Sequence, residues 1–291
     1  MGLKEHQPPL NIDEQITNLK SKGLLIPDEE YAKSVLNDIS YFRLIKAYSL
    51  TLKPKNGNYS ENIYFVYIVE LYLFDVNFRQ LLFPLIEKTE INLRCRIANY
   101  FCEKYGVFGY EDINNFAIPD EMFLVFSEEI QKEVTRNTRA PFIKNFQDNY
   151  IDGKIPLYAL VEILSFGTLS KFYKNMKNED KKAVAKLFDV GYTYFESWIE
   201  NISSVRNICA HYGRLYNAKL PKTPALYKQY TELGISNNRV FSTLLCLKHL
   251  LPTDRYWYEF VENISNLLHK YPKVDKYKIG FIELWEDVLN S

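Results

Sequence analysis

Arg206, Asn207 and His211 bring a guanidinium, an amide and an imidazole into one short segment of the chain. An imidazole accepts or donates a proton near neutral pH, and a planar guanidinium can hold two phosphate oxygens at once. RNA supplies its own nucleophile, the 2′-hydroxyl, so a protein that cleaves it needs proton transfer and stabilisation of the phosphate charge. If the chemistry is RNA cleavage, these three residues could supply both functions without a metal ion, with Asn207 orienting the ring or the phosphate.

The surrounding stretch, residues 193–213, predicts a helix with one buried face. Its apolar residues recur at intervals of three and four, which is typical of an amphipathic helix; they are Phe195, Trp198, Ile199, Ile202, Val205, Cys209 and Tyr212. At about 100° per residue, Arg206 falls within this stripe, whereas Asn207 and His211 share another face, with His211 about 140° from Arg206. Because a buried guanidinium is costly without a partner, we expect Arg206 to be paired or to line a polar cavity.

The charge around this helix differs from that of the whole chain. The 291 residues include 36 basic and 36 acidic ones, a balance that argues against a nucleic-acid coat or a membrane-surface protein. Residues 201–231 contain no Asp or Glu, although roughly four would be expected. A polyanion would be attracted here, and the candidate RNA contacts are Tyr212, Arg214, Tyr216, Asn217 and Lys219. For the two tyrosines, core packing is the role that a chain with 23 tyrosines favours.

A second set of charges could support Arg206. The stretch IEKTEINLRCRIANYF places Glu87, Glu90, Arg94 and Arg96 at helical spacings. One interpretation is a set of i, i+4 salt bridges such as Glu90–Arg94 on a solvated face, each worth a few tenths of a kcal/mol. The other is that Glu90 or Glu87 is the buried partner that Arg206 requires.

The same residues resemble a known family. The run from Arg206 to His211 is similar to the R-x4–6-H motif of HEPN (higher eukaryotes and prokaryotes nucleotide-binding) domains, and VRNICAHYGRLYN resembles the signature of AbiD/AbiF-type abortive-infection proteins of bacteria. The segments ISYFRL, E-I-x-L-R, E-x-x-S-F-G-x-L-S and G-F-x-x-x-W resemble that family too. The resemblance implies a HEPN-like helical bundle and a metal-independent endoribonuclease of phage defence that needs no cofactor. Arg206 and His211 would be its catalytic pair, with Asn207 in support.

The resemblance leaves two alternatives, because some HEPN proteins bind RNA or a partner without cutting. The chain could be a non-catalytic RNA- or protein-binding helical module, or a toxin held inactive by an antitoxin or a regulatory small RNA. A homodimer is also expected. Cleavage needs a base and an acid, yet the window holds one histidine, and two apposed motif helices would supply a second His211. HEPN relatives pair in this way.

The remainder of the chain predicts an all-α fold. An N-terminal helical segment, residues 1–52, should pack on a HEPN-like domain, residues 60–291, after a linker at 53–59. Asn11 and Glu14 form a capping box. Helices are expected at 61–105, kinked or divided by Pro84, at 120–136, at 141–150, at 156–176 with a break at Gly167 and Thr168 as the new N-cap, at 179–189, at 238–251 and at 254–271.

Cysteine spacing and hydropathy bound the location of the protein. Cys95, Cys102, Cys209 and Cys246 show no C-x-x-C pair, so we expect reduced thiols and neither a disulfide framework nor a zinc site. The N-terminus lacks an apolar signal region, and no stretch approaches 18 apolar residues. The sequence predicts a soluble, cytoplasmic protein with no membrane partner.

Overall fold

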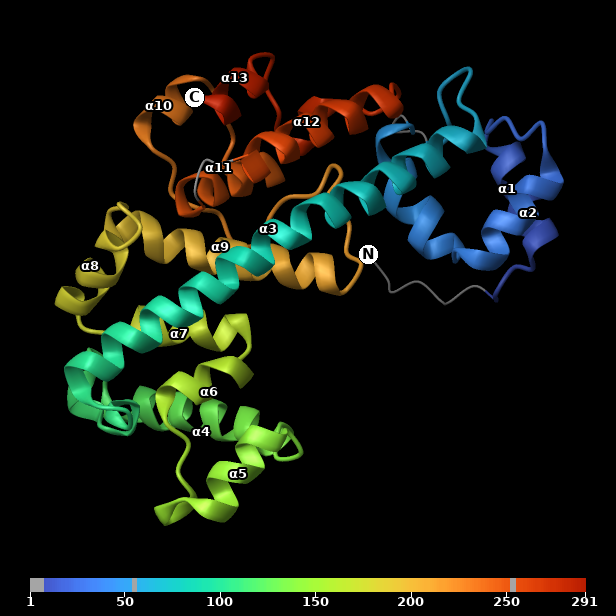
Figure 1. The fold of residues 1–291 in the computed structure, drawn as a ribbon. Helices are drawn as coiled ribbons and strands as arrows, with labels where there is room; N and C mark the ends of the chain where they lie inside the picture. The colour runs from blue at the N-terminus through green and yellow to red at the C-terminus, as the bar shows by residue number, and fades with distance from the viewer. Residues whose placement is uncertain (1–7, 54–56, 252–254) are drawn as a thin grey trace.

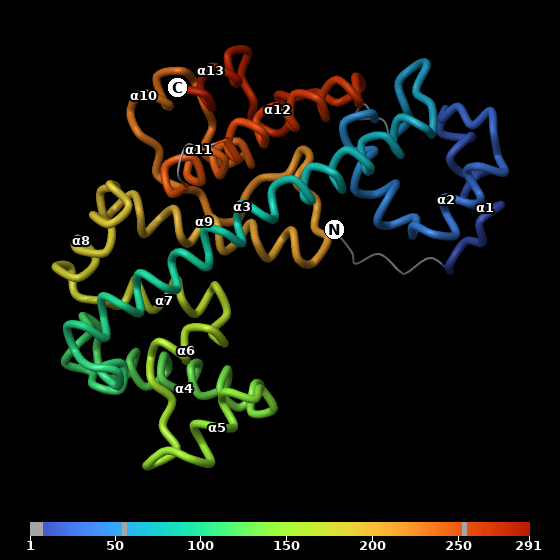
Figure 2. The backbone as a smooth tube through the Cα atoms, in the orientation of Figure 1, coloured from blue at the N-terminus to red at the C-terminus, as the bar shows by residue number. Residues whose placement is uncertain are grey.

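The computed structural model describes residues 8–53, 57–251 and 255–291. Within these ranges all regular elements are helical, and the extended pairings are two isolated bridges, Leu25 with Tyr64 and Phe116 with Met176. The prediction of an all-α fold is confirmed. Figures 1 and 2 show one long helix running through the molecule, with the first two helices at its start and α4 to α6 around its far end.

The long helix is α3, Phe65–Tyr105, which spans 41 residues. It buries side chains all along its length because α6, α9, α11 and α12 pack against it. Of the two effects expected at Pro84, a kink or a division, the division is wrong, since the helix continues through this exposed proline. Leu82, Leu85 and Ile86 lie fully or almost fully buried on either side of it. Packing of these side chains thus holds the two halves together where one backbone hydrogen bond is lost.

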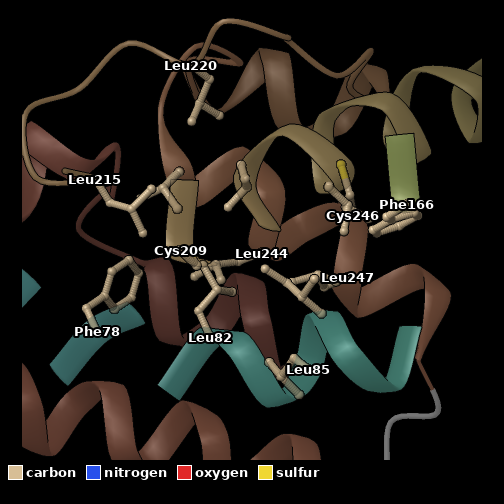
Figure 3. Close-up of a cluster of buried hydrophobic side chains, with 14 of the residues drawn as sticks. Phe78, Leu82, Leu85, Phe166, Cys209, Leu215, Leu220, Leu244, Cys246 and Leu247 are labelled. Atoms are coloured by element: carbon tan, nitrogen blue, oxygen red, sulfur yellow. The ribbon is translucent and has the colours of Figure 1, made fainter. Parts of the chain in front are cut away.

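Helix α9, Tyr192–Ala210, lies beside α3 and carries the predicted motif. It also packs on α7 (Phe166–Asn175), α8 (Asn178–Lys186) and α11 (Val240–Leu250). Its predicted stripe is buried from Phe195 to Cys209, whereas Tyr212 lies outside the helix and is exposed. Figure 3 shows Cys209 in a core cluster with Leu82 and Leu85 of α3 and Leu244 and Leu247 of α11. The motif is therefore attached to the centre of the core.

The described part of the N-terminal segment, residues 8–52, contains α1 (Ile12–Ser21) and α2 (Glu29–Asp38). The predicted capping box of Asn11 and Glu14 is present. A π-helix, Phe42–Lys46, and a short 3-10 helix, Ser49–Thr51, follow before the chain reaches α3. The division into a segment 1–52 and a domain 60–291 stays a prediction, and residues 54–56 of the expected linker lie outside the described ranges.

The other helices that were predicted agree with the expected ranges to within a few residues, except at one break, whereas Lys228–Glu232 and Trp285–Asn290 form helices that were not predicted. In 156–176 the break falls at Leu164, and Ser165 caps the second helix by accepting from the Thr168 N–H, so the expected cap at Thr168 is wrong. The remaining helices are α4 (Asp120–Arg136), α5 (Pro141–Asn149), α6 (Leu157–Ile163), α10 (Lys228–Glu232), α12 (Arg255–Lys270) and α13 (Trp285–Asn290).

No single helix in the described ranges is long and apolar enough to cross a membrane, although the bent pair Ile151–Ile163 and Phe166–Asn175 passes the test of length and composition together.

Candidate active site

Helix α9 ends three residues earlier than predicted, and the turn that ends it shapes the site. The Gly213 N–H donates to the Ile208 carbonyl at 2.7 Å and the Tyr212 N–H to the Cys209 carbonyl at 3.2 Å, which is a Schellman turn with His211 as the C-cap. Tyr212 takes the left-handed position of this turn, at φ 57°, where glycine is usual. A Cβ at Gly213 would come within 2.9 Å of Ile208 Cγ2. Left-handed backbone at a bulky residue is strained, and such strain gathers at functional sites.

Arg206 is held from α3. Its Nε lies 3.4 Å from Oε2 of Glu90 in an ion pair, and this buried nitrogen has no hydrogen-bond partner in the described residues. Arg94 donates to the other oxygen of Glu90 and to the Val161 carbonyl. Glu90 is thus the partner of Arg206, and the Glu90–Arg94 pair is buried rather than solvated, with both residues 9% exposed. Glu87 is exposed.

The structure places Asn207 and His211 at the surface, while the Arg206 side chain is 35% exposed. His211 lines an open pocket of about 300 Å³, which we call the His211 pocket. One wall is the start of the post-motif loop, residues 212–227. The other wall is the N-terminal segment. The lining residues are Ser40, Phe42, Arg43, Ala47, Tyr48, His211, Tyr212, Gly213 and Arg214, and none of them is acidic.

A buried carboxylate, Asp75 of α3, fixes the post-motif loop. It accepts from the Tyr48 hydroxyl at 2.6 Å, from Arg79 Nη1 at 2.8 Å and from the backbone N–H groups of Leu215 and Tyr216 at 3.1 Å and 2.8 Å. Burial raises the pKa of Asp75, while its hydrogen bonds and the charge of Arg79 act in the opposite direction. The network joins the N-terminal segment, α3 and the loop at one point.

This network is not among the features predicted from the sequence. The available signal was a pair of opposite charges, Asp75 and Arg79, four residues apart within a mainly apolar run. The guanidinium of Arg79 also donates to the Gly213 carbonyl at 3.0 Å, so it supports the backbone next to Tyr212.

Arg43 completes the wall of the pocket. Its Nη1 donates to the Tyr212 carbonyl at 2.9 Å, which links the π-helix of the N-terminal segment to the end of the motif. Beyond this contact lies a larger groove of about 850 Å³. It shares Ser40, Arg43 and Tyr212 with the His211 pocket, and its apolar lining includes Ile39, Tyr72, Val76, Phe83 and Ala210.

The comparison with family models decides the family. The model described as Abi-like protein matches residues 34–217, which is more than half of the chain. The chain belongs to the Abi-like protein family. The match includes the π-helix, the Asp75 network, Glu90 with Arg94, and the motif through Asn217, so every residue that lines the His211 pocket lies inside it. No curated protein and no solved structure matches the chain.

The other residues predicted to contact RNA occupy different environments in this Abi-like protein. Arg214 is half-buried in the His211 pocket, Lys219 is exposed, and Asn217 Oδ1 lies 3.4 Å from Arg239 Nη1. The assignment of Tyr216 to RNA contact is wrong. Its side chain is 2% exposed and packs edge-on against Phe74, so the ring cannot stack on a base.

The remaining histidines of the Abi-like protein lie away from the site. His249 lies in the last turn of α11, and its ring is packed against Trp198 and bonded through Nε2 to the Tyr230 hydroxyl at 2.8 Å. His269 is exposed on α12, and His6 lies outside the described residues. His211 is therefore the imidazole that lines the pocket. Within the described ranges no group of three His, Cys, Asp or Glu side chains is placed to hold a metal ion.

Proposed function

We propose that this Abi-like protein is an endoribonuclease of abortive infection that cleaves single-stranded RNA without a metal ion. The observation that supports this most strongly is the division of roles at the end of α9. Arg206 is held against the buried carboxylate of Glu90, whereas His211 opens into a pocket with no acidic lining. A phosphate would find cationic groups there without competition from a carboxylate, and an accessible imidazole beside it.

In this proposal the 2′-oxygen of the substrate attacks the adjacent phosphorus, and the bond from phosphorus to the 5′-oxygen breaks. A base removes the proton of the 2′-hydroxyl, and an acid protonates the departing 5′-oxygen, which leaves a 2′,3′-cyclic phosphate. His211 performs one of the two proton transfers. Neither Arg206 nor Asn207 lines the His211 pocket of the single chain. In this proposal Arg206 stabilises the charge that develops on the phosphate oxygens, and exposed Asn207 orients the phosphate or the ring.

We further propose that the working unit is a homodimer. The second proton carrier is the difficulty, because the Tyr48 hydroxyl of the His211 pocket is already donated to Asp75, and burial raises the pKa of that tyrosine. Two copies that appose the ends of their α9 helices would bring two exposed His211 rings to one substrate. Repulsion between the two basic surfaces opposes this arrangement, and a bound RNA would offset it.

The nuclease proposal is tested by RNA cleavage in the presence of EDTA. The wild type should cleave, His211→Ala should be slower by about 100-fold or more, and His269→Ala, which removes an exposed histidine of α12, should match the wild type. Cleavage by His211→Ala at the wild-type rate would exclude His211 as a proton carrier. RNA binding with no cleavage would instead favour the non-catalytic binding module.

The dimer proposal has its own test. Light scattering over a dilution series should show a dimer that dissociates, and specific activity should fall with it. Mixing the wild type with excess His211→Ala should depress activity further than dilution alone, because mixed dimers would hold one ring. A strictly monomeric, active enzyme would exclude the shared site.

A further inference from the structure

The π-helix of the N-terminal segment presents two neighbouring residues to the His211 pocket. Within Phe42–Lys46 the widened turn buries Leu44 and Ile45 completely, while Phe42 and Arg43 are exposed. Phe42 is 79% exposed and lines the same pocket as His211. A single exposed apolar residue is ordinary, so this exposure alone indicates nothing. π-helices, however, are rare and occur often at functional sites.

A second exposed ring lines the same pocket from the opposite wall. Tyr212 is 71% exposed, and its backbone is left-handed, a conformation that a tyrosine rarely adopts. Arg43 of the π-helix holds the Tyr212 carbonyl, and Arg79 of α3 holds the next carbonyl, that of Gly213. The backbone that carries the tyrosine is thus fixed from two directions while its ring stays in solvent.

The charges of this pocket select the kind of ligand. Two guanidinium groups, Arg43 and Arg214, line it together with the imidazole, and there is no lining carboxylate. The Arg43 guanidinium has five N–H donors, of which the Tyr212 carbonyl takes one, so others remain for a phosphate. Aromatic faces interleaved with arginines are the combination that binds unpaired nucleotides, in which every base offers a π-face.

We infer that Phe42 and Tyr212 form a stacking platform for unpaired bases of single-stranded RNA, with Arg43 as the phosphate contact beside them. The inference rests on the proposed function, because it names the substrate contacts of that same site. It gives the N-terminal segment a role in substrate binding that the motif alone does not contain. A duplex is excluded from this platform because its bases are already stacked and paired.

Binding of a non-cleavable probe tests the platform separately from catalysis. The probe is a fluorescein-labelled, mixed-sequence 2′-O-methyl RNA oligonucleotide, which lacks the 2′-hydroxyl nucleophile, and the readout is fluorescence anisotropy. Loss of one stacked base amounts to about 1–3 kcal/mol, so Phe42→Ala should weaken binding by about 5- to 150-fold. Phe42→Tyr should retain affinity. Leu50→Ala is the matched control, because Leu50 is 58% exposed on the same segment but does not line the pocket.

The inference is overturned if Phe42→Ala binds the probe as tightly as Leu50→Ala does. It is also overturned if a duplex of the same sequence binds equally well and loses affinity equally with Phe42→Ala. A change of oligomeric state in Phe42→Ala, with unchanged affinity for the probe, would assign the ring to a protein contact instead. If the wild type binds the probe more tightly than Phe42→Ala does but cleaves no all-RNA oligonucleotide, the nuclease proposal is refuted and the stacking platform is retained.

Discussion

Oε2 of Glu90 lies 3.4 Å from Nε of Arg206, and this contact couples the middle of α3 to the end of α9. The same carboxylate is bonded to Arg94, so one buried acid faces two guanidinium groups. Arg94 is in turn anchored on the Val161 carbonyl of α6. The position of Arg206 therefore depends on three helices rather than on its own.

We predict that Glu90→Gln lowers both stability and RNA cleavage. Arg94 is buried and would lose its charged partner, which should reduce the free energy of unfolding by roughly 1–3 kcal/mol. The share from Arg206 should be smaller, because its side chain is 35% exposed and partly screened by water. Thermal melting and cleavage assays would measure both effects. Glu87→Gln is the matched control, three residues away and exposed, and should change neither. Equal effects of the two variants would contradict the assignment of Glu90.

Removal of the two motif side chains should separate catalysis from folding. His211 is exposed, so His211→Ala should keep the thermal midpoint within a few degrees while activity is lost. Arg206→Ala should lose activity and also some stability, because Glu90 loses one of its two charged partners. The loss of stability should be limited, since Arg94 remains paired with Glu90. Circular dichroism melts of the two variants make the comparison. If His211→Ala melts markedly lower and Arg206→Ala does not, the structural roles are the reverse of those described.

Tyr212→Gly should stabilise the protein and impair its action on RNA. Glycine adopts the left-handed position of the Schellman turn without strain, which should add roughly 0.5–1 kcal/mol to the free energy of unfolding after the larger chain entropy of glycine is included. Little packing is lost, because the ring is 71% exposed. Tyr212→Ala, which removes the ring and keeps the Cβ, should lose RNA binding without this gain. A fall in the melting temperature of Tyr212→Gly would show that the Tyr212 ring stabilises the folded protein.

Stability should fall on acidification in part through His249. Burial, with the nearby charge of Lys248, lowers the pKa of His249 below its ordinary value of 6.5. The unfolded chain therefore binds a proton at His249 before the folded chain does. The contribution of His249 to the free energy of unfolding is intact above pH 6.5. It is lost as the pH falls towards the lower pKa that His249 has in the folded state.

The melting temperature of the wild type should thus drop more between about pH 7.5 and about pH 5.5 than that of His249→Gln. The variant should start lower, because it loses the bond to Tyr230 and the stack on Trp198. His269→Gln, at an exposed position, is the control. Parallel curves of melting temperature against pH for the wild type and His249→Gln would contradict the lowered pKa of His249 in the folded state.

The features predicted well from the sequence are those that depend on local pattern. The stripe from Phe195 to Cys209, the capping box at Asn11 and the range Asp120–Arg136 follow from periodicity and end signals, and the structure contains them. The spacing of Arg206 within that stripe indicated that it needs a partner or a polar cavity, and of the two interpretations left open the structure contains the carboxylate partner. It did not decide between Glu87 and Glu90, because that choice depends on how α3 is rotated against α9.

The features that sequence reading missed depend on contacts between distant segments. Asp75 accepts from residues 140 and 141 positions later, and no local pattern reports such a pairing. Tyr216 and Tyr212 are both tyrosines of the same loop. The backbone N–H of Tyr216 donates to Asp75 and its side chain is buried, whereas Tyr212 takes a left-handed turn and its side chain is exposed. The wall that Phe42 and Arg43 add to the pocket likewise arises from a separate part of the chain.

The chemistry of the cleaved ends is the most direct test of the central claim that His211 and Arg206 cut RNA through its 2′-hydroxyl. Mass spectrometry would compare products from an RNA oligonucleotide and its 2′-deoxy counterpart, both incubated with the wild type in EDTA. We expect RNA fragments that end in a 2′,3′-cyclic phosphate or 3′-phosphate and an intact deoxy strand with the wild type, and neither kind of RNA fragment with His211→Ala. Cleavage of the deoxy strand at a similar rate, or RNA fragments with a 3′-hydroxyl and a 5′-phosphate, would contradict it.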